Sequence, residues 1–242
     1  GLSRGITSQP SRFTLVTTEG PSMSTLANKS VLVIGASGGL GSHFVSQFSA
    51  AGATPIVASS QNVNLEDQNS VAAFADALII SDLAIDGVVL ASGLVAFGSI
   101  AETPAAITEK LMHVNFLSQA QLVAALLPKL EKSAAAGNEP FVVSISGVIA
   151  ENPMAGMAAY SASKTALHGW AAAASRELRR AGIRMIDARP GHTETGLATR
   201  AIFGQAPAFG AGLHPEKVVA RIIEAIQNEE KDLPSTAFTA CA

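Results

Sequence analysis

The chain has few of the residues that mark secreted, membrane-spanning or nucleic-acid-binding proteins. Its 242 residues include one cysteine, Cys241, so an internal disulfide framework cannot form. A formal net charge of -3 leaves no basic surface for nucleic acid or an anionic membrane. No apolar run approaches the ~20 residues that a membrane helix requires. We therefore expect a soluble, cytoplasmic protein.

The first 22 residues differ in composition from the rest. They are rich in Ser, Thr and Gly and show no helical or strand periodicity, whereas Met23 directly precedes the start of a regular pattern. We interpret 1–22 as a flexible extension and 23–242 as one domain. A transit peptide is the alternative, because Arg4 and Arg12 lie among hydroxyl residues.

From Lys29 onward, short β-branched runs alternate with long Ala- and Leu-rich stretches. Strands are predicted over 31–34, 54–58, 62–65, 87–91, 141–146 and 183–188. Helices are predicted over 42–51, 67–80, 108–132, 157–181 and 215–228, with a kink at Pro128. This alternation predicts an α/β fold, namely a single-domain Rossmann-type doubly wound parallel sheet with helices on both faces. Ligands of such sheets bind beyond the carboxyl ends of the strands.

Tyr160 is the only tyrosine of the chain, and Lys164 follows it by four residues. On a helix, this spacing places both side chains on one face. A phenol with a pKa of about 10 is a poor acid or base at neutral pH, and a nearby cation lowers that pKa. The pair therefore indicates proton transfer, and a surface pair without function is the alternative.

A glycine-rich turn joins the first predicted strand to the first helix. It runs from Gly35 to Gly41 with the pattern Gly-x-x-x-Gly-x-Gly. Glycines let a pyrophosphate approach the backbone, and the helix N-terminus adds N–H donors and partial positive charge. Close packing is the alternative role of such a turn. With the Tyr160 pair, the turn predicts an oxidoreductase that binds a cofactor.

These two motifs together resemble the short-chain dehydrogenase/reductase family, from Lys29 to the C-terminal helix. Three further segments match family patterns in the expected order: 86–93, the Val114-Asn115 pair, and Pro190-Gly191-x-x-x-Thr195. The resemblance covers nearly the whole predicted domain.

The resemblance implies roles for individual residues. Tyr160 would exchange a proton with the substrate oxygen, Lys164 would lower its pKa and bind the nicotinamide ribose, and Asn115 would hold a water linked to Lys164. Ser146 would steady the substrate oxygen, and Thr195 would bind the nicotinamide carboxamide. A local polar contact for Asn115 and a helix N-cap for Thr195 are the alternatives. The implied cofactor contacts are Gly35, Ser37, Gly39, Leu40, Gly41, Ser59, Asn64, Leu65, Gly93, Tyr160, Lys164, Pro190, Gly191, Thr193 and Thr195.

Two departures from the family pattern bear on these expectations. The family's serine lies thirteen residues before the tyrosine, where this chain has Gly147, so Ser146 can replace it only if the loop shifts by one residue. The second strand ends in Ser59 and Ser60, with no acid to bind an adenosine ribose 2′-hydroxyl and no basic residue beside them. We expect NADP or NAD as the cofactor, with a slight preference for NADP.

The remaining features concern the substrate and the assembly. The five histidines show no spacing typical of a metal site, so no metal is expected. Residues 196–214 resemble the family's substrate lid, and their apolar side chains suggest a small apolar carbonyl or alcohol. Ordinary packing of this loop on the core is the alternative. Ala-rich faces of the long helices suggest a homodimer, with a tetramer possible. A cofactor-binding sensor or scaffold without catalysis is the alternative function.

Overall fold

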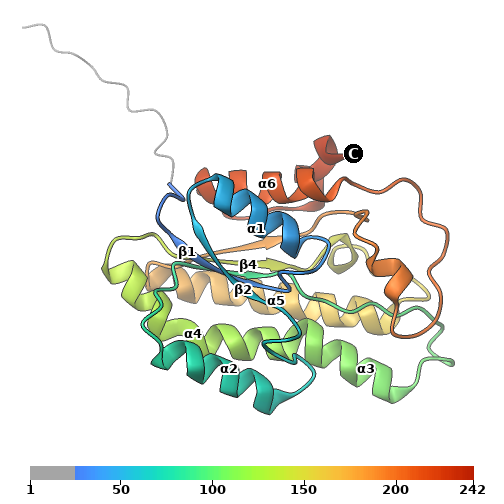
Figure 1. Cartoon of the computed structure of the whole chain (residues 1–242). Coiled ribbons are helices and arrows are strands. Elements are labelled where there is room, and N and C mark those ends of the chain that lie inside the picture. The colour runs from blue at the N-terminus through green and yellow to red at the C-terminus, as the bar shows by residue number, and fades with distance from the viewer. Residues whose placement is uncertain (1–24) are drawn as a thin grey trace, which may run out of the picture.

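The computed structural model describes residues 25–242, so the predicted extension over 1–22 lies outside the described residues. A parallel sheet occupies the centre of the described chain, with helices on both faces (Figure 1). Its strands are β1 (Ser30–Ile34), β2 (Thr54–Ala58), β3 (Gly87–Leu90), β4 (Phe141–Ile145) and β5 (Arg184–Ala188). Their spatial order is β2-β1-β3-β4-β5. The predicted doubly wound Rossmann-type sheet is confirmed.

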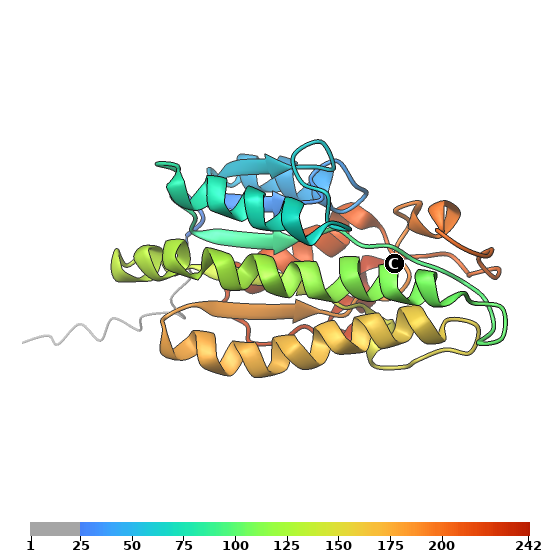
Figure 2. The ribbon, with the colours of Figure 1, turned by 90° about the horizontal axis from the view of Figure 1, so that it is seen from below.

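The helices divide between the two faces of the sheet. One face carries α1 (Gly41–Ala50) and α6 (Pro215–Gln227), and the other carries α2 (Gln68–Ile80), α4 (Ser118–Ala135) and α5 (Ala158–Arg180). Figure 2, the view from below, shows the second group side by side in front of the strands. Successive strand residues point to opposite faces, so Val31 and Val33 pack on one side while Leu32 and Ile34 pack on the other. Core side chains therefore pack on both faces of β1, which lies between β2 and β3 in the sheet.

The strand predicted over 62–65 is absent, because its polar side chains bond the local backbone. The side chain of Asn62 accepts from the Ser59 N–H at 2.9 Å, and that of Asn64 accepts from the Glu66 N–H at 3.0 Å. Such side-chain bonds compete with a strand ladder and favour turns. The sheet of the described residues therefore has five strands instead of the six predicted.

The helix predicted over 108–132 is interrupted in a place that the sequence did not indicate. It consists of α3 (Ala105–Met112), a π-helical turn η1 (His113–Leu117) and α4. Pro128 lies inside α4, and the irregular turn precedes it by a dozen residues. Single π-turns within helices frequently occur at functional sites, and this one contains Asn115.

Three short 3₁₀ turns follow the strand ends or close the chain: η2 (Val148–Ala150), η3 (Leu197–Arg200) and η4 (Ser235–Cys241). Within residues 25–242, none of the helices is both long and apolar enough to cross a lipid bilayer.

Candidate active site

A cavity of about 210 Å³ lies at the carboxyl ends of the strands. Its walls are largely apolar, with a few polar groups that include Tyr160, Lys164 and Ser146. The predicted cofactor residues Leu40, Gly93, Pro190, Gly191, Thr193 and Thr195 also line it. An adjoining cleft, lined by the glycine-rich turn, shares Gly93 and Thr195 with this cavity. The fold thus brings most of the predicted catalytic and cofactor residues together.

Tyr160 and Lys164 lie on one face of α5, one helical turn apart. The Lys164 Nζ atom is 5.9 Å from the centroid of the Tyr160 ring. Tyr160 packs against the apolar cluster of Val95, Phe97, Ile149 and Met157. This burial raises the pKa of the Tyr160 phenol to about 12. The structure therefore shows this pKa raised instead of lowered as predicted, and the cause is desolvation of the phenol.

Lys164 is buried, and its ammonium donates to the carbonyl of Ile145 at 3.0 Å. Burial lowers the pKa of Lys164 to about 8, and the negative charge of Asp187 opposes this shift. At neutral pH the side chain is consequently still charged, but close to its titration point.

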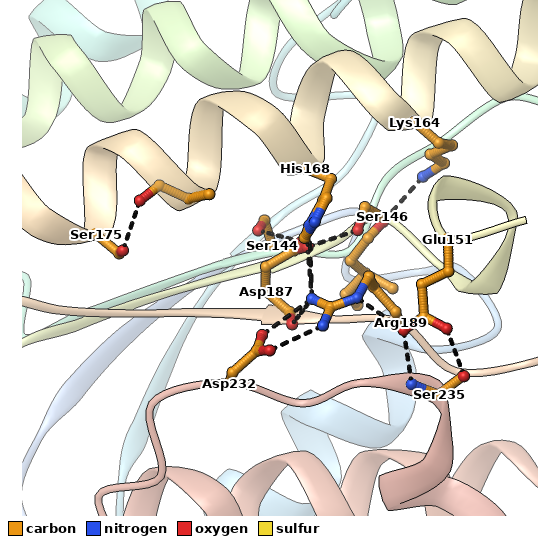
Figure 3. A network of polar contacts seen from close by, with 12 residues as sticks. Ser144, Ser146, Glu151, Lys164, His168, Ser175, Asp187, Arg189, Asp232 and Ser235 are labelled. Atoms are coloured by element: carbon orange, nitrogen blue, oxygen red, sulfur yellow. Dashed lines mark hydrogen bonds and ion pairs between the residues drawn. The ribbon is translucent and has the colours of Figure 1, made fainter.

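Ser146 lines the cavity, but its hydroxyl is directed to a buried carboxylate. The Oγ atom donates to Asp187 Oδ2 at 2.6 Å, and Ser144 donates to Oδ1 of the same side chain at 2.7 Å (Figure 3). The backbone N–H of Gly147 donates to the Ala188 carbonyl, and Gly147 has a φ of 80° that disfavours a side chain. To donate to a substrate oxygen, Ser146 would have to leave Asp187.

Asn115, fully buried in the π-turn, fastens the segment after β3 to α5. Its Oδ1 accepts from the Leu94 N–H at 2.8 Å, and its Nδ2 donates to the Leu94 carbonyl and to Ser163 Oγ. Gln119 adds a bond from its Nε2 to the carbonyl of Ser92 at 3.0 Å. The local polar contact that we considered as the alternative role of Asn115 is thus present. Its predicted water-holding role stays a prediction.

The glycine-rich turn is shaped by backbone contacts at three of its glycines. A Cβ on Gly35 would lie 2.5 Å from Ser92 Oγ, one on Gly41 would lie 1.8 Å from the Gly35 carbonyl oxygen, and one on Gly39 would lie 2.5 Å from Thr195 Cβ. The turn leads directly into α1, so its N–H groups lie where a helix N-terminus attracts a phosphate. Ser37 and Leu40 line the same cleft.

The far end of the cleft is polar and carries little charge. It is lined by Ser59, Ser60, Asn64, Leu65 and Glu66. The Glu66 carboxylate is paired with Lys110 at 3.0 Å. This end therefore has the predicted residues, and the charged pair beside it comes from Glu66 and Lys110, which both lie outside β2.

The segment after β5 lies between the cleft and the cavity. Thr195 Oγ1 accepts from the Leu197 N–H at 3.3 Å, but the N-cap residue of η3 is Gly196, so the N-cap role considered for Thr195 is wrong. Thr195 lines both the cleft and the cavity, and its contact with the nicotinamide carboxamide stays a prediction.

Several lining residues were missed by the sequence analysis because they come from loops without a motif. Val95 and Phe97 enter the cavity from the segment after β3, and Met154 enters from the loop before α5. The imidazole of His192 stacks on Phe209 of the predicted lid, with ring centroids 4.7 Å apart. The only sequence feature that could have indicated these lining residues is the apolar character of residues 95–97.

Comparison with known proteins identifies the class to which this fold and cavity belong. The chain belongs to the short-chain dehydrogenase family, whose sequence model matches residues 58–203. A fruit fly (Drosophila melanogaster) relative, "Dehydrogenase/reductase SDR family protein 7-like", is 27% identical over 240 residues, covering 86% of this chain and 72% of the relative. Mouse (Mus musculus) "Dehydrogenase/reductase SDR family member 7B" is 25% identical, covering 88% and 75%.

Solved structures share the fold. A 3-ketoacyl-(acyl-carrier-protein) reductase from Brucella melitensis, complexed with NADH, superposes with a TM-score of 0.77 at 18% identity, covering 87% of this chain and 97% of its own. A short-chain dehydrogenase from Sphingobium yanoikuyae in complex with NADPH gives 0.70 at 20% identity, covering 86% and 87%.

Proposed function

We propose that the chain is an NAD(P)-dependent reductase that interconverts a carbonyl and an alcohol on a small apolar substrate. Membership of a dehydrogenase family and the NADH and NADPH held by structural relatives support the cofactor. The observation that carries the reaction is that Tyr160 and Lys164 line one apolar cavity, which adjoins the glycine-rich cleft.

The residues present fit a dinucleotide. The cleft leads from the polar end near Ser59, past the glycine-rich turn, to Gly93 at the cavity. A Cβ on Gly93 would lie 3.5 Å from Lys164 Nζ, so its absence leaves room beside the ammonium. The cofactor supplies or accepts the hydride; the chain binds it, excludes water and moves the proton. Without an acid after β2, we keep a slight preference for NADP.

Carbonyl reduction uses Tyr160 in its protonated form. A phenol with a pKa of about 12 is protonated at neutral pH, so it can donate its proton to a developing alkoxide. The positive charge of Lys164 then stabilises the phenolate that remains. The apolar walls from Val95, Phe97 and Met154 exclude water and suit an apolar ketone or aldehyde.

The first experiment replaces Tyr160 by phenylalanine, which removes the phenolic proton and keeps the aromatic ring. Tyr160→Phe should lower turnover by about 10²–10⁴-fold, the usual contribution of a general acid, while the Kd for NADPH stays within about twofold. Oxidation of NADPH and NADH would be followed across a panel of ketones, aldehydes and quinones. Equal rates for the two proteins would overturn the assignment. Cofactor binding without turnover by the unaltered chain would favour the sensor.

Assembly and location stay predictions. The Ala-rich run 171–174 of α5 supports close contact with a second copy, and a solution mass of twice 24.7 kDa would support the dimer. A cytoplasmic location is consistent with the single, unpaired Cys241 and is tested by localising the tagged chain.

A further inference from the structure

A cofactor with a pyrophosphate brings at least two negative charges into the cleft, which has few cations to meet them. Of the residues that line the cleft in the described part of the chain, Arg200 is the only arginine or lysine. The single lining acid, Glu66, is already neutralised by Lys110. The charge balance of the cleft therefore depends on Arg200.

Arg200 ends the 3₁₀ turn η3 and lines the same cleft as the glycine-rich turn. Its Nη1 atom is 3.5 Å from the Thr195 carbonyl oxygen. Thr195 in turn packs on Gly39, whose added Cβ would lie 2.5 Å from Thr195 Cβ. The guanidinium is thus two contacts away from the N–H groups that precede α1, where a pyrophosphate binds best.

The local backbone is built to fold this side chain back over the turn. Gly196, which starts η3, has a φ of 78°, and a Cβ there would lie 2.7 Å from Arg200 Nη1. The lack of a side chain at Gly196 makes room for the guanidinium. Arg200 is exposed and forms no ion pair within residues 25–242, so most of its five N–H donors are available to a ligand.

We propose that Arg200 binds the pyrophosphate of the nicotinamide cofactor. This inference rests on the proposed function for the presence of a cofactor, but not on which carbonyl is reduced. The bond also ties η3 to the bound cofactor. Because Leu197 of the same turn lines the substrate cavity, cofactor binding positions one wall of that cavity.

The test measures the dissociation constants of NADPH, NADH and ADP-ribose by titration calorimetry. All three ligands carry the pyrophosphate, and ADP-ribose lacks the nicotinamide. Arg200→Ala should weaken all three by a similar factor, about 10-fold to 100-fold, which is typical of a lost hydrogen bond to a charged group. Arg200→Lys should recover part of the loss, and the loss should shrink in high salt.

Arg176→Ala is the matched control, because Arg176 is exposed on α5, does not line the cleft and changes the net charge equally. Unchanged affinities for Arg200→Ala would overturn the inference, as would an equal loss in the control. A loss confined to NADPH would also overturn it, since it would assign Arg200 to the 2′-phosphate. Failure of the unaltered chain to bind any of the ligands would overturn the proposed function as well. Binding without turnover would overturn the proposed reaction alone.

Discussion

The buried ammonium of Lys164 has two charged neighbours of different kinds. In the proposed reaction Tyr160 would become a phenolate during reduction, whereas the Asp187 carboxylate is a permanent part of the core and raises the Lys164 pKa that burial lowers. The balance leaves the pKa at about 8, so a modest rise in pH removes the positive charge. The activity of the proposed reductase should respond to this titration.

We expect kcat/KM for carbonyl reduction to be level near neutral pH and to fall above about pH 8, up to tenfold per pH unit, as Lys164 loses its proton. The folded pKa lies below the ordinary value of 10.5, so the folded chain binds fewer protons than the unfolded chain between these values. The contribution of Lys164 to stability therefore rises with pH there, and the fall in activity is not unfolding caused by this group. Steady-state rates between pH 6 and 9.5 measure the profile.

Lys164→Met is the control for that profile. It should be slower at neutral pH and should lose the alkaline limb, because no ammonium remains to titrate. A wild-type profile that stays level to pH 9.5, or a limb that persists in the variant, would contradict the assignment to Lys164.

For single residues, the sequence predicts which side chains share one face of a helix. It does not predict which acceptor a hydroxyl group bonds. Tyr160 and Lys164 are four residues apart on α5, so their common face follows from helix geometry alone. The Ser146 hydroxyl instead donates to Asp187, which lies 41 residues away on the neighbouring strand. No local pattern reports such a contact.

Among the elements, the strand–turn–helix unit of β1 and α1 follows most directly from the sequence. The buried β-branched run, the glycines and the first helix are contiguous, and each was expected within one residue of its observed position. The absent strand at 62–65 and the π-turn at 113–117 were not expected. The first depends on side-chain bonds of two asparagines, and the second contains Asn115, which bonds the distant Leu94 backbone.

The glycine-rich turn gives a prediction at the scale of the element. Gly41→Ala would place a Cβ 1.8 Å from the Gly35 carbonyl oxygen, so the turn and α1 must separate. We expect a stability loss of about 1–3 kcal/mol or more from overpacking and a much weaker binding of NADPH. Thermal unfolding and a binding titration measure the two effects.

Gly38→Ala is the matched change in the same turn. Its Cβ would lie 3.3 Å from the same oxygen, which a shift of a few tenths of an ångström relieves. This variant should stay close to wild type in stability. Equal losses of stability and NADPH affinity in Gly41→Ala and Gly38→Ala would contradict this explanation. Close packing of the turn on α1 would then not account for the glycine at position 41.

Across the whole molecule, one buried network connects segments that are distant in sequence. Arg189, just after β5, donates to both carboxylate oxygens of Asp232 at 2.9 Å and to Glu151 Oε1 at 2.9 Å. Glu151 also accepts from the N–H and hydroxyl of Ser235, while Arg189 lies 3.3 Å from Asp187 Oδ2. The network therefore joins three parts of the chain: the loop that contains Glu151, the end of β5, and the segment after α6 that contains Asp232 and Ser235 (Figure 3).

Helix α5 reaches the same network through His168, whose Nδ1 lies 2.6 Å from Asp187 Oδ2. His168 follows Lys164 by one helical turn on α5. The sequence gave no indication of this cluster, because its members come from five separate segments and match no motif. The cluster forms only when tertiary packing brings these five segments together.

Removing the guanidinium of Arg189, the central cation of this network, should lower the stability of the folded protein. Arg189→Met keeps the volume of the side chain but leaves the buried Asp187 without its cation; the Arg189 and Asp187 side chains are 6% and 7% exposed. Breaking a buried pair from one side typically costs about 3–5 kcal/mol, which corresponds to a fall in Tm of roughly 6–20 °C for a chain of this size. Since Glu151 leads the loop that lines the cavity, KM for the carbonyl should rise more than kcat falls.

Asp232→Asn separates this explanation from a general effect of altered charge. Its side chain is 58% exposed, so solvent replaces the lost partner and the expected cost is below about 1 kcal/mol. Calorimetric unfolding of both variants, with KM and kcat measured beside it, distinguishes the buried contact from the exposed one. An unchanged Tm for Arg189→Met would contradict the prediction, and so would an equal loss in Asp232→Asn, because the energy would then reside in the exposed pair that anchors the C-terminal segment.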